Sequence, residues 1–129
     1  MILVPAGEFI MGTNKIDTED THKKIGAVKP LYLDQHPERK IFLDEYYIDQ
    51  YEVTNAEYSH FLEVNQFTDL PAHWQGGVFP KEQGDHPVTQ VTWWEAWSYC
   101  QSNGKQLPTE EQWEKAARGP AGLPFPWGE

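Results

Sequence analysis

Candidate metal ligands are the first side chains in this sequence that could do chemistry. The five histidines are scattered, and no two have the spacing that places a zinc-binding pair on one face of a helix. They are His22, His36, His60, His73 and His86. Asp17, Glu19 and Asp20 form a small acidic cluster, but the glycine and the distal glutamate of a calcium loop are missing. The pattern favours loop histidines bonded to backbone and a solvated acidic loop.

Cys100 is the one candidate thiol nucleophile, because the sequence contains a single cysteine. One cysteine allows neither an intramolecular disulfide nor a multi-cysteine zinc site. Cys100 falls beside Trp97 on the expected apolar face of a helix, where burial raises the pKa of a thiol and makes it unreactive. The sequence also contains neither a Gly-Xaa-Ser-Xaa-Gly elbow nor a glycine-rich phosphate loop. We therefore expect a structural role for Cys100.

Paired carboxylates and a tryptophan cluster complete the chemical candidates. Glu110–Glu111 and Asp44–Glu45 are adjacent pairs, and adjacent residues do not face each other on a helix. The helix dipole explains the first pair without catalysis. Trp93, Trp94 and Trp97 could form a carbohydrate platform, but core packing is the stronger interpretation for Trp93 and Trp97, and Trp94 stays open. The residues alone therefore predict no catalytic, cofactor-binding or metal-binding side chain.

Composition and charge exclude several function classes. The chain has 129 residues and a formal net charge of −10, which argues against nucleic acid and against docking on an anionic membrane. No apolar run approaches the ~20 residues of a membrane span. The N-terminus does not have the form of a signal peptide. We expect a periplasmic or secreted protein if a leader precedes Met1 and a cytoplasmic one otherwise.

The arrangement of apolar residues predicts short strands between long loops. Ten glycines and ten prolines are typical of many turns. Residues 2–12 are expected to form two extended pieces around a turn at Pro5–Gly7, with Phe9 and Met11 on one face. Residues 41–53 should form a second strand pair with a break near Asp44–Glu45. A short strand is expected at 88–91, and irregular loops at 13–40 and 66–87.

Three capping boxes predict three short helices. Each pairs a threonine with a Glu or Gln three residues later: Thr54 with Glu57, Thr92 with Glu95, and Thr109 with Gln112. The inward faces are expected to be Tyr58, Phe61 and Leu62, then Trp93, Ala96, Trp97 and Cys100, then Trp113, Ala116 and Ala117. Val53 should staple against Tyr58. Gly104 and Gly119 should end the second and third helices.

Four sequence blocks in order resemble the formylglycine-generating enzyme family, also called sulfatase-modifying factors. The blocks are VPAGEFIMG at 4–12, YYIDQYEVTNAEYSHFL at 46–62, HPVTQVTWWEAWSYC at 86–100, and LPTEEQWEKAARG followed by FPWG at 107–128. The resemblance implies a C-type-lectin-like α+β fold with few regular elements. It also implies that Thr109, Trp113 and Arg118–Gly119 hold the fold and do no chemistry.

The resemblance further implies that 1–129 is the N-terminal part of one domain. The family oxidises a sulfatase cysteine to formylglycine with oxygen, copper and a cysteine pair, and it carries calcium loops and an RGGSW-like segment. All of these follow the PWG block, so none lies in this chain, and Cys100 sits in the wrong block to belong to the pair. Phe125 and Trp127 are then large rings without cover. The expected partner is the remaining half of the domain or another protein.

Whether the protein is an enzyme stays open at this point. One alternative is a non-catalytic family member that serves as a binding or assembly module, with the loops 13–40 and 66–87 as contact surfaces. A less favoured alternative is an iron-dependent sulfoxide synthase with the same fold, whose separate iron-binding domain this sequence does not supply.

Overall fold

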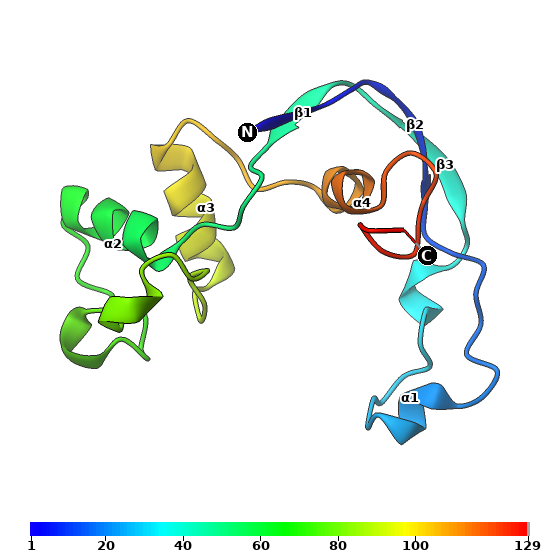
Figure 1. Cartoon of the computed structure of the whole chain (residues 1–129), viewed down its shortest axis with the longest axis horizontal. Helices are drawn as coiled ribbons and strands as arrows, with labels where there is room; N and C mark the ends of the chain where they lie inside the picture. The colour runs from blue at the N-terminus through cyan, green and yellow to red at the C-terminus, as the bar shows by residue number, and fades with distance from the viewer. Residues whose placement is uncertain (129) are drawn as a thin grey trace. The chain divides into compact units, whose positions relative to one another are not determined.

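The computed structural model describes residues 1–128 and divides the chain into two compact units (Figure 1). The first unit comprises Met1–Ile48 and the segment that begins at Pro108, and the second comprises Asp49–Leu107. Short helices and strands alternate with loops in the first unit, and the second unit contains helices and loops. Together they confirm the expected α+β class. Each unit is described by itself below.

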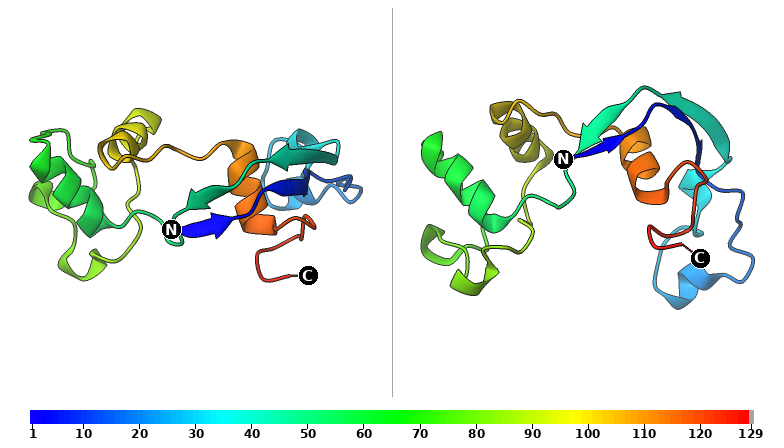
Figure 2. Two further views of the ribbon diagram at one scale, coloured as in Figure 1. Left: turned by 90° about the horizontal axis from the view of Figure 1, so that it is seen from above. Right: turned by 45° about the horizontal axis from the view of Figure 1, so that its top comes forward.

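Two antiparallel strand pairs form the sheet part of the first unit (Figure 2). Strand β1 (Ile2–Val4) pairs with β4 (Tyr46–Ile48), and β2 (Gly7–Met11) pairs with β3 (Arg39–Leu43). The chain leaves both pairs where the sequence predicts, at Pro5–Ala6 and at Asp44–Glu45. Phe9 and Met11 are buried on one face of β2, so the predicted alternation is confirmed.

Helix α4 (Glu110–Arg118) packs on β2 through polar side chains. Lys115 is only 5% exposed, and its Nζ donates to the carbonyl oxygens of Pro5 at 2.8 Å and Gly7 at 3.0 Å. The Tyr46 hydroxyl donates to the Gln112 carbonyl at 2.6 Å. The helix is therefore anchored to the turn between β1 and β2 by hydrogen bonds to main-chain oxygens.

Arg118 closes the last turn of α4 onto three carbonyls. Its Nε, Nη2 and Nη1 donate to Leu123 (2.8 Å), Gly122 (2.7 Å) and Gly12 (3.0 Å). Nη1 also pairs with Glu114, whose carboxylate accepts from the Gly12 amide at 2.7 Å. Gly12 has φ of +78°, and a Cβ there would collide with the Gln35 carbonyl, so only glycine fits the position that this pair holds. The structure agrees with the expected scaffold role of Arg118.

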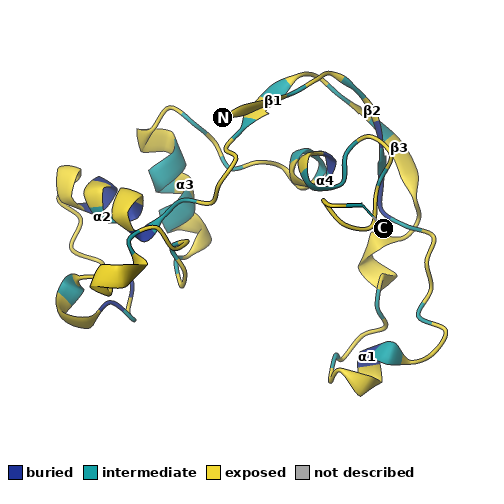
Figure 3. Cartoon of the chain, in the orientation of Figure 1, coloured by how far each residue is buried: buried dark blue, intermediate teal, exposed yellow. Residues whose placement is uncertain are grey.

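The predicted inward face of α4 is wrong. Trp113 is 62% exposed and Ala116 is exposed, while Ala117 is half-buried. The prediction depends on the apolar stripe of α4, the only indication of a buried face in the sequence. In the structure, the side of α4 that faces the strands carries Lys115 and Arg118, whose side chains donate to backbone oxygens. Figure 3 shows a buried part of this helix beside half-exposed and exposed parts. The buried residue of the helix is Lys115.

The segment between β2 and β3 is irregular apart from helix α1 (Thr21–Lys24) and the 3-10 turn η1 (Leu33–Gln35). The expected loop at 13–40 therefore holds for most of its length. It ends two residues early, because β3 begins at Arg39.

The second unit consists of α2 (Asn55–Val64), α3 (Trp93–Ser102) and the loop between them. That loop contains two 3-10 turns, η2 (Gln75–Gly77) and η3 (Lys81–Gln83). Its core is a cluster of Tyr58, Phe61, Leu62 and Trp74, against which Val53, Phe79, Val88, Val91 and Tyr99 pack. The predicted face of α2 is confirmed, and Val53 lies on it as the staple requires.

All three capping boxes form as predicted. In each, the threonine oxygen accepts from the backbone amide three residues on, and that residue's side chain accepts from the threonine amide. Such a cap stabilises a helix by about 1 kcal/mol, which matters most for helices of nine or ten residues. Gly104 and Gly119 follow α3 and α4 with positive φ, again as predicted.

Two other predictions for the second unit are wrong. Residues 88–91 form no strand, because the chain makes only an isolated bridge from Thr54 to Pro87 and Gln90 adopts a left-handed conformation. On α3, Trp93 and Trp97 are 58% and 40% exposed, and the ring that meets α2 is Tyr99. The helix carries aromatics on two faces, so periodicity could not decide which face would be buried.

We expect Lys115→Met to destabilise the protein by about 1–3 kcal/mol, because it removes two charge-assisted hydrogen bonds from a buried site and leaves two carbonyls without a donor. Urea unfolding followed by circular dichroism measures the change. Lys40→Met, at an exposed position on β3, is the matched control and should change stability by less than about 0.5 kcal/mol. Equal effects of the two substitutions would contradict the anchoring role.

Candidate functional site

The most site-like feature of the second unit is a groove of about 170 Å³ between α2, α3 and the segment after α2. Tyr58, Phe61, Phe67 and Trp94 supply aromatic walls. Asp69, Glu95 and Ser98 add polar groups. The volume is below the ~300 Å³ at which small-molecule sites usually begin, so the groove suits one side chain or one small ring.

Three tryptophans on α3 adjoin this groove, with Trp94 lining it. The Trp93 and Trp94 rings meet edge to face with centroids 4.7 Å apart, and Trp97 lies 6.2 Å from Trp94 and 6.5 Å from Trp93. Trp94 is 69% exposed, the most of the three. The core interpretation of Trp93 and Trp97 is therefore wrong, and the three rings form one exposed aromatic surface, called the tryptophan cluster below.

The groove is electrostatically negative. Burial, and then the charge of Glu95, raises the pKa of Tyr58 to about 12. Hydrogen bonds from Thr92 lower the pKa of Glu95, so its carboxylate is ionised at neutral pH. Residues 49–107 contain eight Asp or Glu and two Lys or Arg, a formal net charge of −6. One of the two cations, Lys105, already pairs with Asp49 at 2.7 Å.

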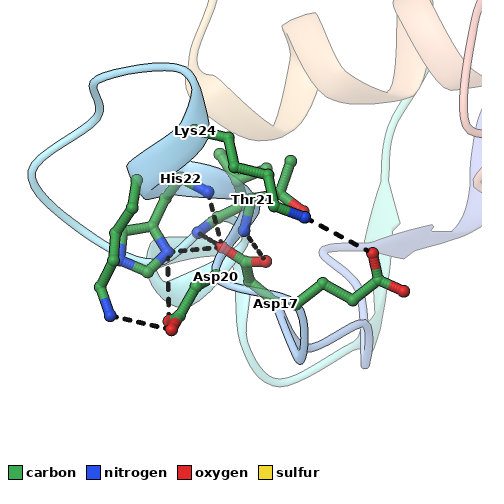
Figure 4. A network of polar contacts seen from close by, with 8 residues as sticks. Asp17, Asp20, Thr21, His22 and Lys24 are labelled. Atoms are coloured by element: carbon green, nitrogen blue, oxygen red, sulfur yellow. Dashed lines mark hydrogen bonds and ion pairs between the residues drawn. The ribbon is translucent and has the colours of Figure 1, made fainter.

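The predicted solvated acidic loop is correct for Glu19 and Asp20 but wrong for Asp17. The Asp17 side chain is only 2% exposed, whereas Asp20 and Glu19 are 62% and 79% exposed. Asp17 accepts hydrogen bonds from the Thr21 amide (2.8 Å), the His22 amide (3.0 Å) and His22 Nδ1 (2.6 Å), and a longer one from the Leu31 amide (3.4 Å) (Figure 4). The sequence signal for this arrangement is slight, because an Asp four residues before a threonine is common.

These hydrogen bonds set the electrostatics of Asp17. The hydrogen bond from the His22 amide is the main reason that the pKa of the Asp17 carboxyl lies well below its usual range. The His22 ring and the Thr21 and Leu31 amides lower this pKa further, and burial opposes them. An ionised carboxylate thus orders the turn that contains α1. We therefore assign Asp17 a structural role.

The other histidines do not converge. His36 Nε2 lies 2.6 Å from the Lys15 carbonyl, as expected for a loop histidine, and His73 Nδ1 is buried without a partner among the described residues. Residues 1–128 contain no group of three His, Cys, Asp or Glu that could hold a metal ion.

Cys100 and Glu111 behave as the sequence predicts. Cys100 is half-buried on α3, and burial raises the pKa of its thiol, so the nucleophilic thiolate is disfavoured. Hydrogen bonds from its own amide and from Thr109 lower the pKa of Glu111 at the start of α4. Both groups belong to helix structure.

The family of the chain follows from comparison with known proteins. The model of the sulfatase-modifying factor enzyme 1-like domain matches residues 1–129. The chain therefore belongs to this family, which confirms the resemblance found in the sequence. Among residues 1–128, no helix combines the length and apolar character needed to cross a membrane.

The chain matches relatives that are named as the enzyme and relatives that are named as inactive. It is 33% identical to the uncharacterized protein YfmG of Bacillus subtilis (strain 168), with 100% of the chain and 27% of that protein aligned. It is 32% identical to the formylglycine-generating enzyme of Bos taurus, over 99% of the chain and 42% of that protein. It is 28% identical to the inactive C-alpha-formylglycine-generating enzyme 2 of Mus musculus, over 99% of the chain and 50% of that protein. The chain thus spans half or less of each relative.

We expect Asp17→Asn to destabilise the protein at pH 7. The new side chain keeps one oxygen but loses the negative charge that accepts hydrogen bonds from three backbone amides and the His22 ring. A depressed pKa contributes stability above the unfolded value near 4, and that contribution disappears as the pH falls toward the folded value. The stability difference between the two proteins should therefore shrink below about pH 4. Urea unfolding at several pH values measures it, with Asp20→Asn, at an exposed side chain, as the control. A difference independent of pH would contradict the role of the charge.

Proposed function

We propose that residues 1–129 are the N-terminal part of one formylglycine-generating-type domain with a C-type-lectin-like fold. The observation that carries this proposal is the outward position of Trp113. This residue lies on the face of α4 that is apolar in the sequence, and 62% of it is exposed. Phe125 and Trp127 add a stacked, exposed ring pair with centroids 5.3 Å apart. Large aromatic rings gathered at an exposed surface often mark a contact with further polypeptide.

The reaction proposed for the whole domain is the oxidation of a sulfatase cysteine to formylglycine. The catalytic cysteine pair, copper and calcium are assigned to sequence outside 1–129, as the resemblance implies. The part played by this chain is positional: Lys115 and Arg118 fix α4 to the strands, and the capped helices fix the aromatic faces. The immediate partner of the apolar face of α4 and of the Phe125–Trp127 ring pair is the remaining half of the domain.

The alternative is a non-catalytic binding or assembly subunit with the same fold. The 28% identity to a relative named inactive supports this alternative. The alignment with that relative covers 99% of the chain of residues 1–129, the same share as the alignment with the relative named as the enzyme. The two functions differ in one measurable property, the conversion of a cysteine in a sulfatase-derived peptide to an aldehyde.

We expect the full-length protein, loaded with copper, to convert such a peptide. Because Cys100 is a half-buried structural thiol, Cys100→Ala should leave the rate of conversion within about twofold. Mass spectrometry and trapping of the aldehyde with hydroxylamine measure the product. The controls are single substitutions of each cysteine that the full-length protein has outside residues 1–129. Two of these substitutions should abolish conversion. Abolition by Cys100→Ala, with unfolding unchanged, would contradict the assignment of Cys100. Absence of product from the unmodified protein would favour the non-catalytic alternative.

A further inference from the structure

The groove between α2 and α3 combines three properties that together indicate one kind of ligand. Its walls are aromatic, its volume of about 170 Å³ is that of a single side chain, and its polar groups include the carboxylates of Asp69 and Glu95. Aromatic faces attract cations through the negative charge of the ring face, most strongly for tryptophan. Carboxylates add charge-assisted hydrogen bonds to the same kind of group.

The two carboxylates are available for a ligand. Among residues 1–128, neither Asp69 nor Glu95 forms an ion pair with a lysine, arginine or histidine. Glu95 uses Oε2 to accept from the Thr92 amide at 2.6 Å, as part of the capping box, and its other oxygen has no partner within the described residues. The cap also fixes the orientation of this carboxylate, so the Glu95 charge at the groove is already ordered before a ligand arrives.

The surrounding charge favours a cation over a neutral ligand. The unit carries a formal net charge of −6, and one of its two cations is bound to Asp49. A neutral ligand that covered Asp69 and Glu95 would strip water from two negative groups without compensation, which is costly. A cation compensates both. Net negative charge also steers a basic partner toward this unit.

The tryptophan cluster extends the surface beyond the groove. Trp93 and Trp97 are exposed beside Trp94 and offer apolar area to residues that flank an inserted side chain. Tryptophan and arginine are the residues most enriched at the energetic centres of protein interfaces. A planar guanidinium can stack on an indole ring and still donate to carboxylates at its edge.

We propose that this groove binds an arginine or lysine side chain of a basic segment in a partner protein, with Trp94 as the stacking surface and Asp69 and Glu95 as the countercharges. The groove lining contains no cysteine, the residue type on which the family's reaction depends. The site is therefore expected in the full-length protein whether or not that protein oxidises cysteine.

The test is a titration of the full-length protein with a short Gly/Ser peptide that carries one arginine between two leucines. Its matched control carries citrulline, which keeps the shape and loses the charge. The indole N–H signals of the tryptophans in two-dimensional NMR report binding even when it is weak. We expect the arginine peptide to shift the Trp94 signal and to bind at least about fivefold more tightly than the citrulline peptide, with the difference reduced by added salt.

Variants locate the site. Trp94→Ala and Asp69→Asn each change an exposed residue, and Glu95→Gln keeps the geometry of the capping box, so folding should be retained. Each should weaken binding of the arginine peptide at least about threefold, whereas Phe42→Ala, at an exposed aromatic residue outside the second unit, should not.

Three results would overturn the proposal. Equal binding of the two peptides would show that charge is not recognised. Binding of a neutral oligosaccharide at Trp94, with no response to the arginine peptide, would make the cluster a sugar platform. Protection of Trp94 from acrylamide quenching in the full-length protein would show that the chain's own remaining sequence fills the groove.

Discussion

The first unit depends on the hydrogen bonds between the cations of one helix and the main-chain oxygens of the strands beside it. Lys115 binds the turn that joins β1 to β2, and Arg118 binds Gly12 at the end of β2 together with the loop after the helix. A buried ammonium group is costly unless it is hydrogen-bonded, so the two Lys115 hydrogen bonds fix the rotation of α4 about its axis. Once that rotation is fixed, Trp113 has to face outward.

The second unit reaches a similar result by packing. Tyr99 meets Tyr58 and Phe61 with ring centroids 5.9 and 5.3 Å apart, and this contact decides which side of α3 faces α2. The tryptophan cluster is left on the exposed side of the same helix. In both units a short, capped helix therefore buries one side within the described residues and presents large aromatic rings on another. Exposed aromatic surface of this kind is normally covered or used for binding.

Local signals in the sequence predicted local structure well. Each Thr with Glu or Gln at the third following position marked a helix start, because the reciprocal hydrogen bonds need only those two side chains. The break at Asp44–Glu45 and the alternation of Phe9 and Met11 likewise depend on neighbours in the sequence. The face of each helix was predictable only for α2, where Tyr58, Phe61 and Leu62 form a single apolar stripe. On α3 and α4, the choice depended on distant partners, Tyr58 in one case and the Pro5 and Gly7 carbonyls in the other.

The same distinction applies to the candidate site. Trp93, Trp94 and Trp97 were visible as a possible platform, but their exposure follows from the packing of Tyr99, which periodicity does not reveal. Asp69 gave no signal at all, because its position at the groove is set by the loop after α2. The sequence predicts a solvated Asp17, since nothing in it shows that three separate amides converge on this carboxylate.

The central claim is that the apolar face of α4 is a contact surface for further polypeptide of the same domain. Hydroxyl-radical footprinting read by mass spectrometry tests it, with the oxidation of Trp113 compared between the chain of residues 1–129 and the full-length protein. Buried Tyr58 should be protected in both and serves as the internal reference. The account predicts that Trp113 is oxidised rapidly in the chain of residues 1–129 and is strongly protected in the full-length protein. Equal oxidation of Trp113 in the two proteins would contradict it.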